Sequence, residues 1–451
     1  MSSSRFVSVI AALSILMGIA GAHTAHAAQR NILVIIADDY GIDQAPYYPT
    51  SAGRLNTNPL APPQPNLTAL AKKGVLFKST TAQQECSPTR AEVMTGRYGF
   101  RTGIGAYIRE GYPVLAMSEF TLAEAFNKAG RGYETSAIGK WHLSYGVLDP
   151  NKQGFGYYAG YLGAFGGGAL GNYFNWAETI NGVKKSQPKY ATTEQVDQTI
   201  GRIAKAKTDG KPYLIWLGFN TPHIPYHVPP VVLHHEGDLP PFQDGMNPDP
   251  YFRAMVESMD TEIGRLLQSV DLSTTTVVFL GDNGTARGDI EQPYNPKHGK
   301  SSIYQQGIEV PLLIAGAGVA APGRVAGGLV NAVDIYPTIL ELAGISPAAI
   351  LPPGLKFDGR SFLSSVTGTA TPARAWAYSD GFQLSPTDHY ERSIRNAAYK
   401  YIEFAGGSGH LYNLVADPLE ANDLTKQTMN SKEMTQYNVL RSQMHSLISS
   451  Q

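Results

Sequence analysis

The sequence alternates between short apolar runs and segments with helical spacing, and this alternation constrains the fold most. Asn31–Ala37 is a continuous apolar run, as expected of a parallel strand that is buried on both faces. Similar runs occupy residues 213–219, 274–280 and 311–315, and helical segments occupy residues 65–73, 121–130, 251–270 and 334–342. This order predicts an α/β fold with a large, mainly parallel sheet and helices on both faces.

Length and composition set the scale of that fold. The chain has 451 residues, of which 43% are hydrophobic and 16% charged, so a large core and two subdomains are expected. The formal net charge is −1 and no long charged run occurs, which gives no reason to expect nucleic-acid binding.

The first residues have the pattern of a targeting signal. Arg5 precedes an apolar stretch over residues 6–20, and Ala25-His26-Ala27 has the small-x-small form of a signal-peptidase site. We expect residues 1–27 to be a signal peptide and the mature protein to be periplasmic or secreted. An uncleaved anchor is the alternative. No later segment resembles a membrane span, so stable membrane association after cleavage is not expected.

Oxygen-bearing side chains follow two of the predicted strands. Asp38 and Asp39 come directly after residues 31–37, and Asp282 and Asn283 follow the run at residues 274–280. In open α/β sheets, ligands bind outside the carboxyl ends of the strands. The set suits a hard divalent cation, Ca²⁺ first and Mg²⁺ second. The alternative is that these residues only form turns.

Cys86 is the only cysteine of the chain and therefore cannot close an internal disulfide. It could be an inert buried side chain, an intermolecular link or a reactive centre. Pro88 suits the first turn of a helix over residues 88–94, which would place Cys86 at a helix N-terminus that attracts anions. Arg90, one turn further on, adds a permanent positive charge.

The pattern C-x-P-x-R around Cys86 resembles the signature of the type I sulfatases, which belong to the alkaline phosphatase superfamily. In that family the cysteine is oxidised enzymatically to formylglycine. Residues 132–142, Gly-Tyr-Glu-Thr-Ser-Ala-Ile-Gly-Lys-Trp-His, resemble the second signature of the family. Residues 220–223, Asn-Thr-Pro-His, and residues 299–302, Gly-Lys-Ser-Ser, resemble the segments that supply a second histidine and a sulfate-binding lysine.

The resemblance extends from residue 31 to residue 424. Near its end, residues 410–414 and residues 417–420 resemble the L-Y-x-L and D-P-x-E segments of the family, which we interpret as structural. We therefore expect a catalytic α/β domain over residues 28–355. Residues 356–451 would form a smaller α+β subdomain with a short antiparallel sheet and a final helix.

The resemblance implies an arylsulfatase-like sulfuric ester hydrolase that uses formylglycine and a divalent cation. A maturation enzyme would generate the formylglycine from Cys86. The implied catalytic residues are Cys86, Arg90, Lys140, His142, His223 and Lys300, and the implied metal ligands are Asp38, Asp39, Cys86, Asp282 and Asn283. The hydrate of the aldehyde would attack sulfur. His223, with Lys300, would protonate the departing oxygen, and His142 would deprotonate the second hydroxyl so that sulfate leaves.

Two other functions are compatible with the same motifs. One is a phosphate or phosphonate monoester hydrolase on the same scaffold, and the other is a non-catalytic protein that binds sulfated glycans. The substrate could be an aryl sulfate or a sulfated saccharide. Six aromatic residues either line its pocket or pack in the core, namely Tyr40, Tyr107, Phe165, Tyr173, Phe174 and Trp176.

Overall fold

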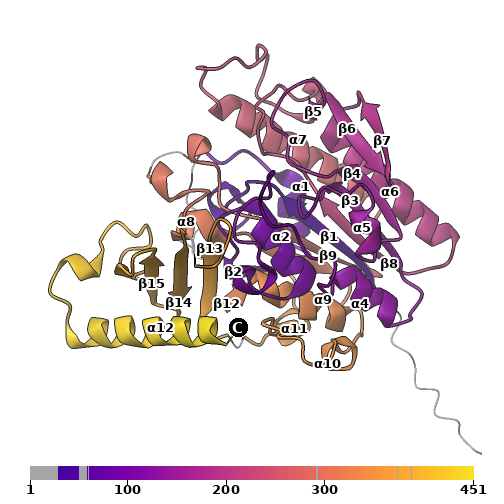
Figure 1. Cartoon of the computed structure of the whole chain (residues 1–451). Helices are drawn as coiled ribbons and strands as arrows, with labels where there is room; N and C mark the ends of the chain where they lie inside the picture. The colour runs from indigo at the N-terminus through magenta and orange to yellow at the C-terminus, as the bar shows by residue number, and fades with distance from the viewer. Residues whose placement is uncertain are drawn as a thin grey trace, which may run out of the picture.

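The computed structural model of the protein describes residues 29–49, 58, 60–290, 293–372, 374–387 and 389–450. These residues form a sheet of 12 strands and a smaller sheet of 4 strands, with helices around both (Figure 1). The predicted signal peptide lies outside the described residues. Within the described residues, no helix is long and apolar enough to cross a membrane.

Parallel strands form the centre of the large sheet. β1 (Asn31–Ala37) pairs in parallel with β8 (Tyr213–Gly218) on one side and with β9 (Thr275–Gly281) on the other. β3 (Glu134–Lys140) continues the parallel order beyond β8. β1 has the predicted bounds, β8 ends one residue before the predicted run, and β9 begins and ends one residue later than its predicted run. The α/β fold expected from the sequence is confirmed.

Antiparallel strands on both sides make the sheet as a whole mixed. β11 (Leu312–Gly316) lies between β9 and β2 (Gly74–Thr81) and is antiparallel to both, so β2 runs in the same direction as the parallel centre. On the other side, β4 (Tyr157–Tyr161) is parallel to β3 and antiparallel to β6 (Asn175–Ile180). The remaining strands are β5 (Gly171–Asn172), β7 (Val183–Gln187), β10 (Glu309–Val310) and β12 (Arg324–Asn331).

Helices cover both faces of the large sheet. Successive residues of β1 point to opposite faces, and the apolar side chains on each face pack against the helices of that side. Val34 and its neighbours on one face pack against α2 (Cys86–Thr95), α4 (Leu122–Lys128) and α9 (Ile335–Leu342). Ile35 on the other face packs with α1 (Pro65–Ala71), α6 (Ala191–Thr208) and α7 (Asp249–Leu267).

Short helical turns connect these elements. The α-helical ones are α3 (Gly99–Thr102), α5 (Asp149–Lys152), α8 (Gln305–Ile308), α10 (Pro347–Ile350) and α11 (Leu363–Val366). The 3-10 turns are Ile42–Gln44, Val231–Leu233, Arg287–Asp289, Pro296–His298, Ala332–Asp334 and Leu424–Lys426.

The smaller sheet is antiparallel throughout, as predicted. Its strands follow in sequence order and are β13 (Ala377–Gly381), β14 (Glu391–Arg395), β15 (Tyr399–Phe404) and β16 (Gly409–Asn413). The final helix, α12 (Ser431–Ser449), lies along this sheet and is yellow in Figure 1. Leu440 and Met444 of α12 pack against Tyr401 of β15. Phe362 packs in the core of the large sheet, and the domain boundary near residue 355 stays a prediction.

Candidate active site

The carboxyl ends of the parallel strands meet at one edge of the large sheet, and the predicted site residues follow them. Asp38 directly follows β1, and its N–H donates to the carbonyl of Thr221 in the segment after β8 (3.1 Å). The N–H of Asp282, directly after β9, donates to the carbonyl of Ala37 in β1 (3.0 Å). These backbone bonds hold the predicted metal ligands and the Thr-Pro-His segment side by side.

Helix α2 presents Cys86 at the same edge. Glu85 is extended, with φ −139° and ψ 158°, and the helix begins at Cys86. It ends at Gly96, whose φ of 69° is left-handed and whose N–H donates to the carbonyl of Glu92 (2.8 Å). Cys86 therefore lies at a helix N-terminus, as predicted.

The Cys86 thiol is enclosed by basic groups. The Nζ of Lys140 lies 3.3 Å from the Sγ, and so does the Nδ1 of His142. The residue is only 1% exposed. Burial raises the pKa of the Cys86 thiol to about 12, although the charges of Lys140 and Lys300 act in the opposite direction. The unmodified thiol is therefore protonated at neutral pH and is a poor nucleophile.

His142 presents an unprotonated ring nitrogen to Cys86. Its Nε2 lies 3.1 Å from the carbonyl oxygen of Ile108, which can only accept a hydrogen bond, so Nε2 carries the proton. Burial, together with the charges of Lys140 and Arg90, lowers the pKa of His142 well below its ordinary value. The Nδ1 lone pair of this neutral ring therefore faces the side chain at position 86.

Two buried ion pairs fix the acidic side chains beside Cys86. The Nζ of Lys140 lies 2.6 Å from the Oδ2 of Asp38, and the Nε of Arg90 donates to the Oδ2 of Asp282 (2.9 Å). All four side chains are fully buried. Burial and the charge of Asp38 raise the pKa of Asp282 to about 6. The two carboxyl groups therefore lie close enough to repel each other, which a cation between them would relieve.

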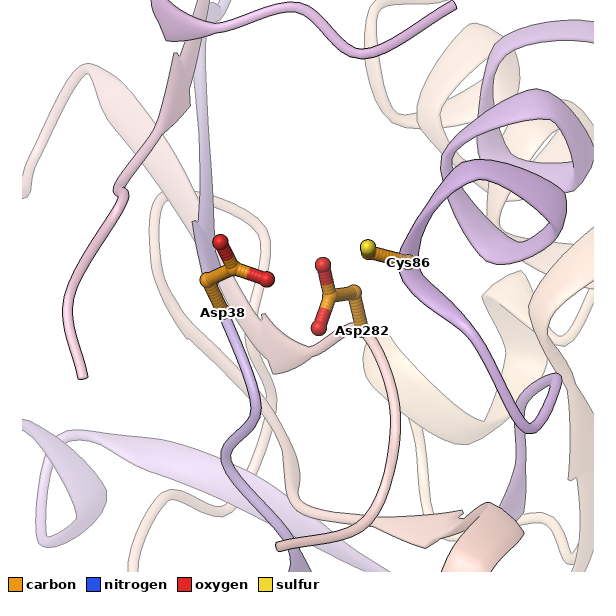
Figure 2. A group of neighbouring side chains, drawn as sticks. All are labelled: Asp38, Cys86 and Asp282. Carbon is orange, nitrogen blue, oxygen red and sulfur yellow. The ribbon is translucent and has the colours of Figure 1, made fainter. Parts of the chain in front are cut away.

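The donor atoms around this point fit a hard divalent cation. Asp38, Cys86 and Asp282 point toward one another from β1, α2 and the end of β9 (Figure 2), and their ligand atoms all lie within 4.8 Å of one another. Asp38 Oδ1 and Asn283 Oδ1 are buried and accept no hydrogen bond from any described residue. Buried acceptors without partners are costly, and carboxylate and amide oxygens are the ligands that Ca²⁺ and Mg²⁺ take.

Asp39 lies beside that group and contacts the other predicted residues. Its Oδ1 accepts from the Nδ2 of Asn283 (2.9 Å) and pairs with the Nζ of Lys300 (2.6 Å), while its Oδ2 lies 3.9 Å from the Nε2 of His223. Burial alone would raise the pKa of Asp39, but the charges of Lys300, His223 and Lys140 together outweigh it and the pKa falls below its ordinary value. Asp39 therefore connects the possible cation ligands to Lys300 and His223.

His223 is held as a neutral ring as well. Its Nδ1 lies 2.7 Å from the carbonyl oxygen of Ile224, so Nδ1 donates and Nε2 carries the lone pair. Burial lowers the pKa of His223 to about 3. The side chains of His223 and Lys300 are 12% and 15% exposed, whereas those of Arg90 and Lys140 are fully buried. His223 and Lys300 therefore mark the solvent side of the site.

Three residues at this edge have left-handed backbone conformations, which residues other than glycine rarely adopt. They are Asp39 (φ 62°), His142 (φ 52°) and Ser301 (φ 63°), and each carries or adjoins a predicted site residue. Such conformations persist where the surrounding structure enforces them, and they cluster at functional sites.

Sequence reasoning missed two groups that position the histidines. One is the carbonyl of Ile108, and the other is the hydroxyl of Tyr173, which lies 2.6 Å from the carbonyl oxygens of both Asn220 and His223. The sequence indicated Tyr173 only as an aromatic residue of a pocket or of the core, and did not indicate this contact. Of the six aromatic residues considered for a pocket, Tyr40, Phe165, Tyr173 and Trp176 are buried in the core, and Tyr107 and Phe174 are exposed.

The chain is similar to known proteins over most of its length. Residues 30–345 match the Sulfatase family, and residues 297–449 match the family described as N-sulphoglucosamine sulphohydrolase, C-terminal. Arylsulfatase G of Mus musculus is 29% identical over 432 residues, which cover 85% of this chain and 77% of that protein. The ulvan-active sulfatase of Formosa agariphila is 26% identical over 388 residues, covering 80% and 72%.

A solved structure supports the fold over nearly the whole chain. The crystal structure of Ps i-CgsB in complex with k-i-k-neocarrahexaose superposes with a TM-score of 0.76 at 22% identity and covers 93% of each chain. The family match covers more than half of the sequence and confirms the resemblance seen in the motifs. The chain belongs to the sulfatase family, and it is a sulfuric ester hydrolase.

Proposed function

We propose that this sulfatase hydrolyses aryl sulfates or sulfated saccharides with a formylglycine made from Cys86 by a maturation enzyme. The observation that carries the proposal is the placement of Cys86. Its Sγ marks where the reactive group would begin, at a helix N-terminus and within reach of Lys140, His142 and two carboxylates. A thiol with a pKa of about 12 is unsuited to attack at neutral pH, whereas hydrated formylglycine would supply an oxygen nucleophile.

A divalent cation held by Asp38, Asp39, Asp282 and Asn283 with side chain 86 would supply positive charge to the sulfate oxygens. The protein itself supplies further positive charge to the site. Lys140 and Arg90 are buried and fixed by ion pairs, so their charges need no reorganisation when the ester binds. Ca²⁺ is our first choice of cation and Mg²⁺ our second, because the donor set is made of oxygens.

His142 is placed to remove a proton from side chain 86. Its Nε2–H is fixed on the carbonyl of Ile108, so the Nδ1 lone pair, 3.3 Å from the Sγ of Cys86, can accept a proton. The low pKa of His142 keeps that lone pair available at neutral pH. We assign His142 the step that regenerates the aldehyde and releases sulfate.

Lys300 and His223 are placed to assist the leaving oxygen. Both lie on the more exposed side of the site, where the rest of a substrate must extend. The charge of Asp39 raises the pKa of Lys300 against the effect of burial, so Lys300 is protonated and can donate a hydrogen bond. His223 is neutral, and a bound anion near its Nε2 would raise its pKa toward the range where it can donate a proton.

The names of the relatives include an arylsulfatase as well as proteins of saccharide chemistry, so both kinds of substrate stay within the proposal. One relative is described as ulvan-active, and one structural neighbour holds a neocarrahexaose. We also propose that the chain is exported to the periplasm or secreted, on the pattern of residues 1–27. N-terminal sequencing of protein from a fractionated culture tests the export.

The central test is peptide mass spectrometry of active protein. Residue 86 should be lighter than cysteine by the mass difference to formylglycine, and Cys86→Ala should lower turnover of an aryl sulfate by more than ~10³-fold. Full activity with only unmodified Cys86 would remove the proposed nucleophile. A phosphate monoester hydrolysed as efficiently as its sulfate counterpart would favour the phosphatase alternative.

A further inference from the structure

A cavity of about 190 Å³ lies beside the active site, between the two sheets of the protein. One wall is formed by Gln84 and Glu85, which directly precede Cys86, and a second by residues 105–112. The third wall comes from residues 381–383 at the end of β13 and from His389 and Glu391 at the start of β14, both in the smaller sheet region. Pockets for drug-sized ligands are roughly 300–1,000 Å³, so this cavity suits one small unit of a larger substrate.

The cavity is held in a fixed position relative to the reacting group. Ile108 lies between Tyr107 and Arg109 of the second wall, and its N–H donates to the Oγ of Ser87 (3.0 Å). Its carbonyl accepts from the Nε2 of His142 (3.1 Å) and from the hydroxyl of Tyr145 (2.8 Å). A ligand in the cavity would therefore keep a constant distance from Cys86 and from the base that serves it.

Arg109, next to Ile108, offers an available cation to this cavity. It is exposed, and within the described ranges it forms no ion pair with a carboxylate. Its Nη1 donates to the hydroxyl of Tyr107 (2.9 Å), and its Nη2 donates to the hydroxyl of Tyr112. The guanidinium also lies over both rings, 5.2 Å from the centre of Tyr107 and 4.2 Å from that of Tyr112.

These contacts organise the guanidinium before any ligand arrives. A guanidinium has five N–H donors, and the two tyrosine hydroxyls occupy only one on each of two nitrogens. Tyr112 is braced in turn by the side chain of Gln383 in the third wall (3.4 Å). The remaining planar donors match a carboxylate or a sulfate, and the fixed rotamer lowers the entropy cost of binding.

The other groups that line the cavity suit the hydroxyl and C–H groups of a sugar ring. Glu85 and Glu391 offer carboxylate acceptors for hydroxyl groups, although Glu85 already accepts from the hydroxyl of Ser301. Tyr107, 38% exposed, offers an aromatic face for C–H groups. We propose that the cavity binds the saccharide unit next to the sulfated one, and that Arg109 recognises an anionic group on that unit. The group is a uronate carboxylate or a second sulfate ester, and the proposal rests on the proposed function.

The test compares Arg109→Ala with the parent enzyme on matched substrates. They are an aryl sulfate, a neutral monosulfated disaccharide, and disaccharides whose second unit bears a carboxylate or a sulfate. Arg109→Ala should lower the ratio of kcat/KM for an anionic to the neutral disaccharide at least tenfold, because one charged, forked contact is lost. Arg109→Lys keeps the charge without the fork and should give an intermediate ratio. The anionic disaccharide whose kcat/KM falls in Arg109→Ala identifies the anionic group that Arg109 recognises.

Binding to a Cys86→Ala background separates this proposal from the proposed function. Calorimetry of the same disaccharides requires no turnover, and adding Arg109→Ala should weaken binding of the anionic ones at least tenfold. Arg441→Ala, an exposed arginine on α12, is the matched control and should change neither ratio nor affinity. An equal effect of Arg109→Ala on all substrates, or no effect on affinity, would overturn the proposal. Absence of sulfate release by the parent enzyme would instead overturn the proposed function.

Discussion

At the scale of single residues, backbone carbonyls decide which nitrogen of each histidine near the site is protonated. His142 donates to Ile108, His223 donates to Ile224, and the Nδ1 of His227 donates to the carbonyl of Pro225 (2.9 Å). A carbonyl can only accept, so the second nitrogen of each ring is left as an acceptor. The ring of His227 also packs against Tyr173, 4.0 Å between ring centres, and Tyr173 supports the His223 segment.

His227 makes the stability of the fold sensitive to acid. Burial lowers the pKa of His227 to about 4 in the folded protein, below the ordinary value of 6.5. As the pH falls through this range, the unfolded chain binds a proton before the folded one does, so stability is lost. The loss between pH 6.5 and pH 4 amounts to up to ~3 kcal/mol. Glutamine does not titrate, so His227→Gln should lose less stability over the same range.

Urea unfolding at pH 6.5 and pH 4 measures this difference. His235→Gln removes a histidine whose side chain is 86% exposed and is the matched control. The assignment fails if His227→Gln and the parent protein lose the same free energy of unfolding on acidification.

At the scale of elements, the sequence predicted best those strands whose environment is uniform. β1 was predicted with its true bounds because a strand buried on both faces is almost entirely apolar. β7 was missed because nearly all of it is exposed and no apolar alternation marks it. α2 was predicted from Pro88 rather than from periodicity, since all of its residues are buried, including Arg90 and Glu92.

The residues of the candidate site also differ in whether they could be predicted from the sequence. Residues in long motifs, such as Lys140 and His142, could be named from the sequence because the motif requires particular side chains. The carbonyl of Ile108 could not, because any residue type supplies a carbonyl. The cavity beside Arg109 could not be predicted either, since one wall comes from residues 381–383, His389 and Glu391, far away in the sequence.

Contacts between elements also explain the role of the C-terminal motif at residues 417–420, which we interpreted from the sequence as structural. Glu420 accepts the N–H of Gln305, the first residue of α8, and its Oε1 lies 2.9 Å from the Nζ of Lys400 in β15. Both side chains of this ion pair are buried. Burial lowers the pKa of Lys400 to about 8 even with Glu420 beside it. The smaller sheet thus holds the segment that follows Lys300.

Glu420→Gln should therefore destabilise the protein by about 3 kcal/mol, because it leaves the ammonium group of Lys400 buried without its counter-charge. Urea unfolding of the single variant gives the value. The double variant Lys400→Met/Glu420→Gln removes the stranded charge and should recover part of the loss. If the double variant is as unstable as the sum of both single variants, the two side chains are not coupled and the interpretation is wrong.

At the scale of the whole molecule, the site is a junction between the two sheets. The parallel strands of the large sheet supply the acidic residues, while the smaller sheet supports the Lys300 segment and closes the Arg109 cavity. Three carboxylates, on Asp38, Asp39 and Asp282, are opposed by the cations of Lys140, Lys300 and Arg90. The three cations balance the three carboxylates in formal charge. A divalent cation would then add the positive charge that an anionic ester requires.

The last prediction follows from that balance and concerns metal and stability together. A cation that binds only the folded site should stabilise the whole molecule, by ~2.7 kcal/mol at a hundred times its Kd, which corresponds to a rise in Tm of a few degrees. Adding Ca²⁺ to chelator-treated protein should produce this rise, and Mg²⁺ should produce a smaller one.

Asp282→Asn removes one ligand charge and should abolish both the calcium-induced rise and the bound metal measured by emission spectrometry. Asp244→Asn, at an exposed position, is the matched control and should keep both. An Asp282→Asn protein with full metal content and an unchanged shift would place the cation elsewhere.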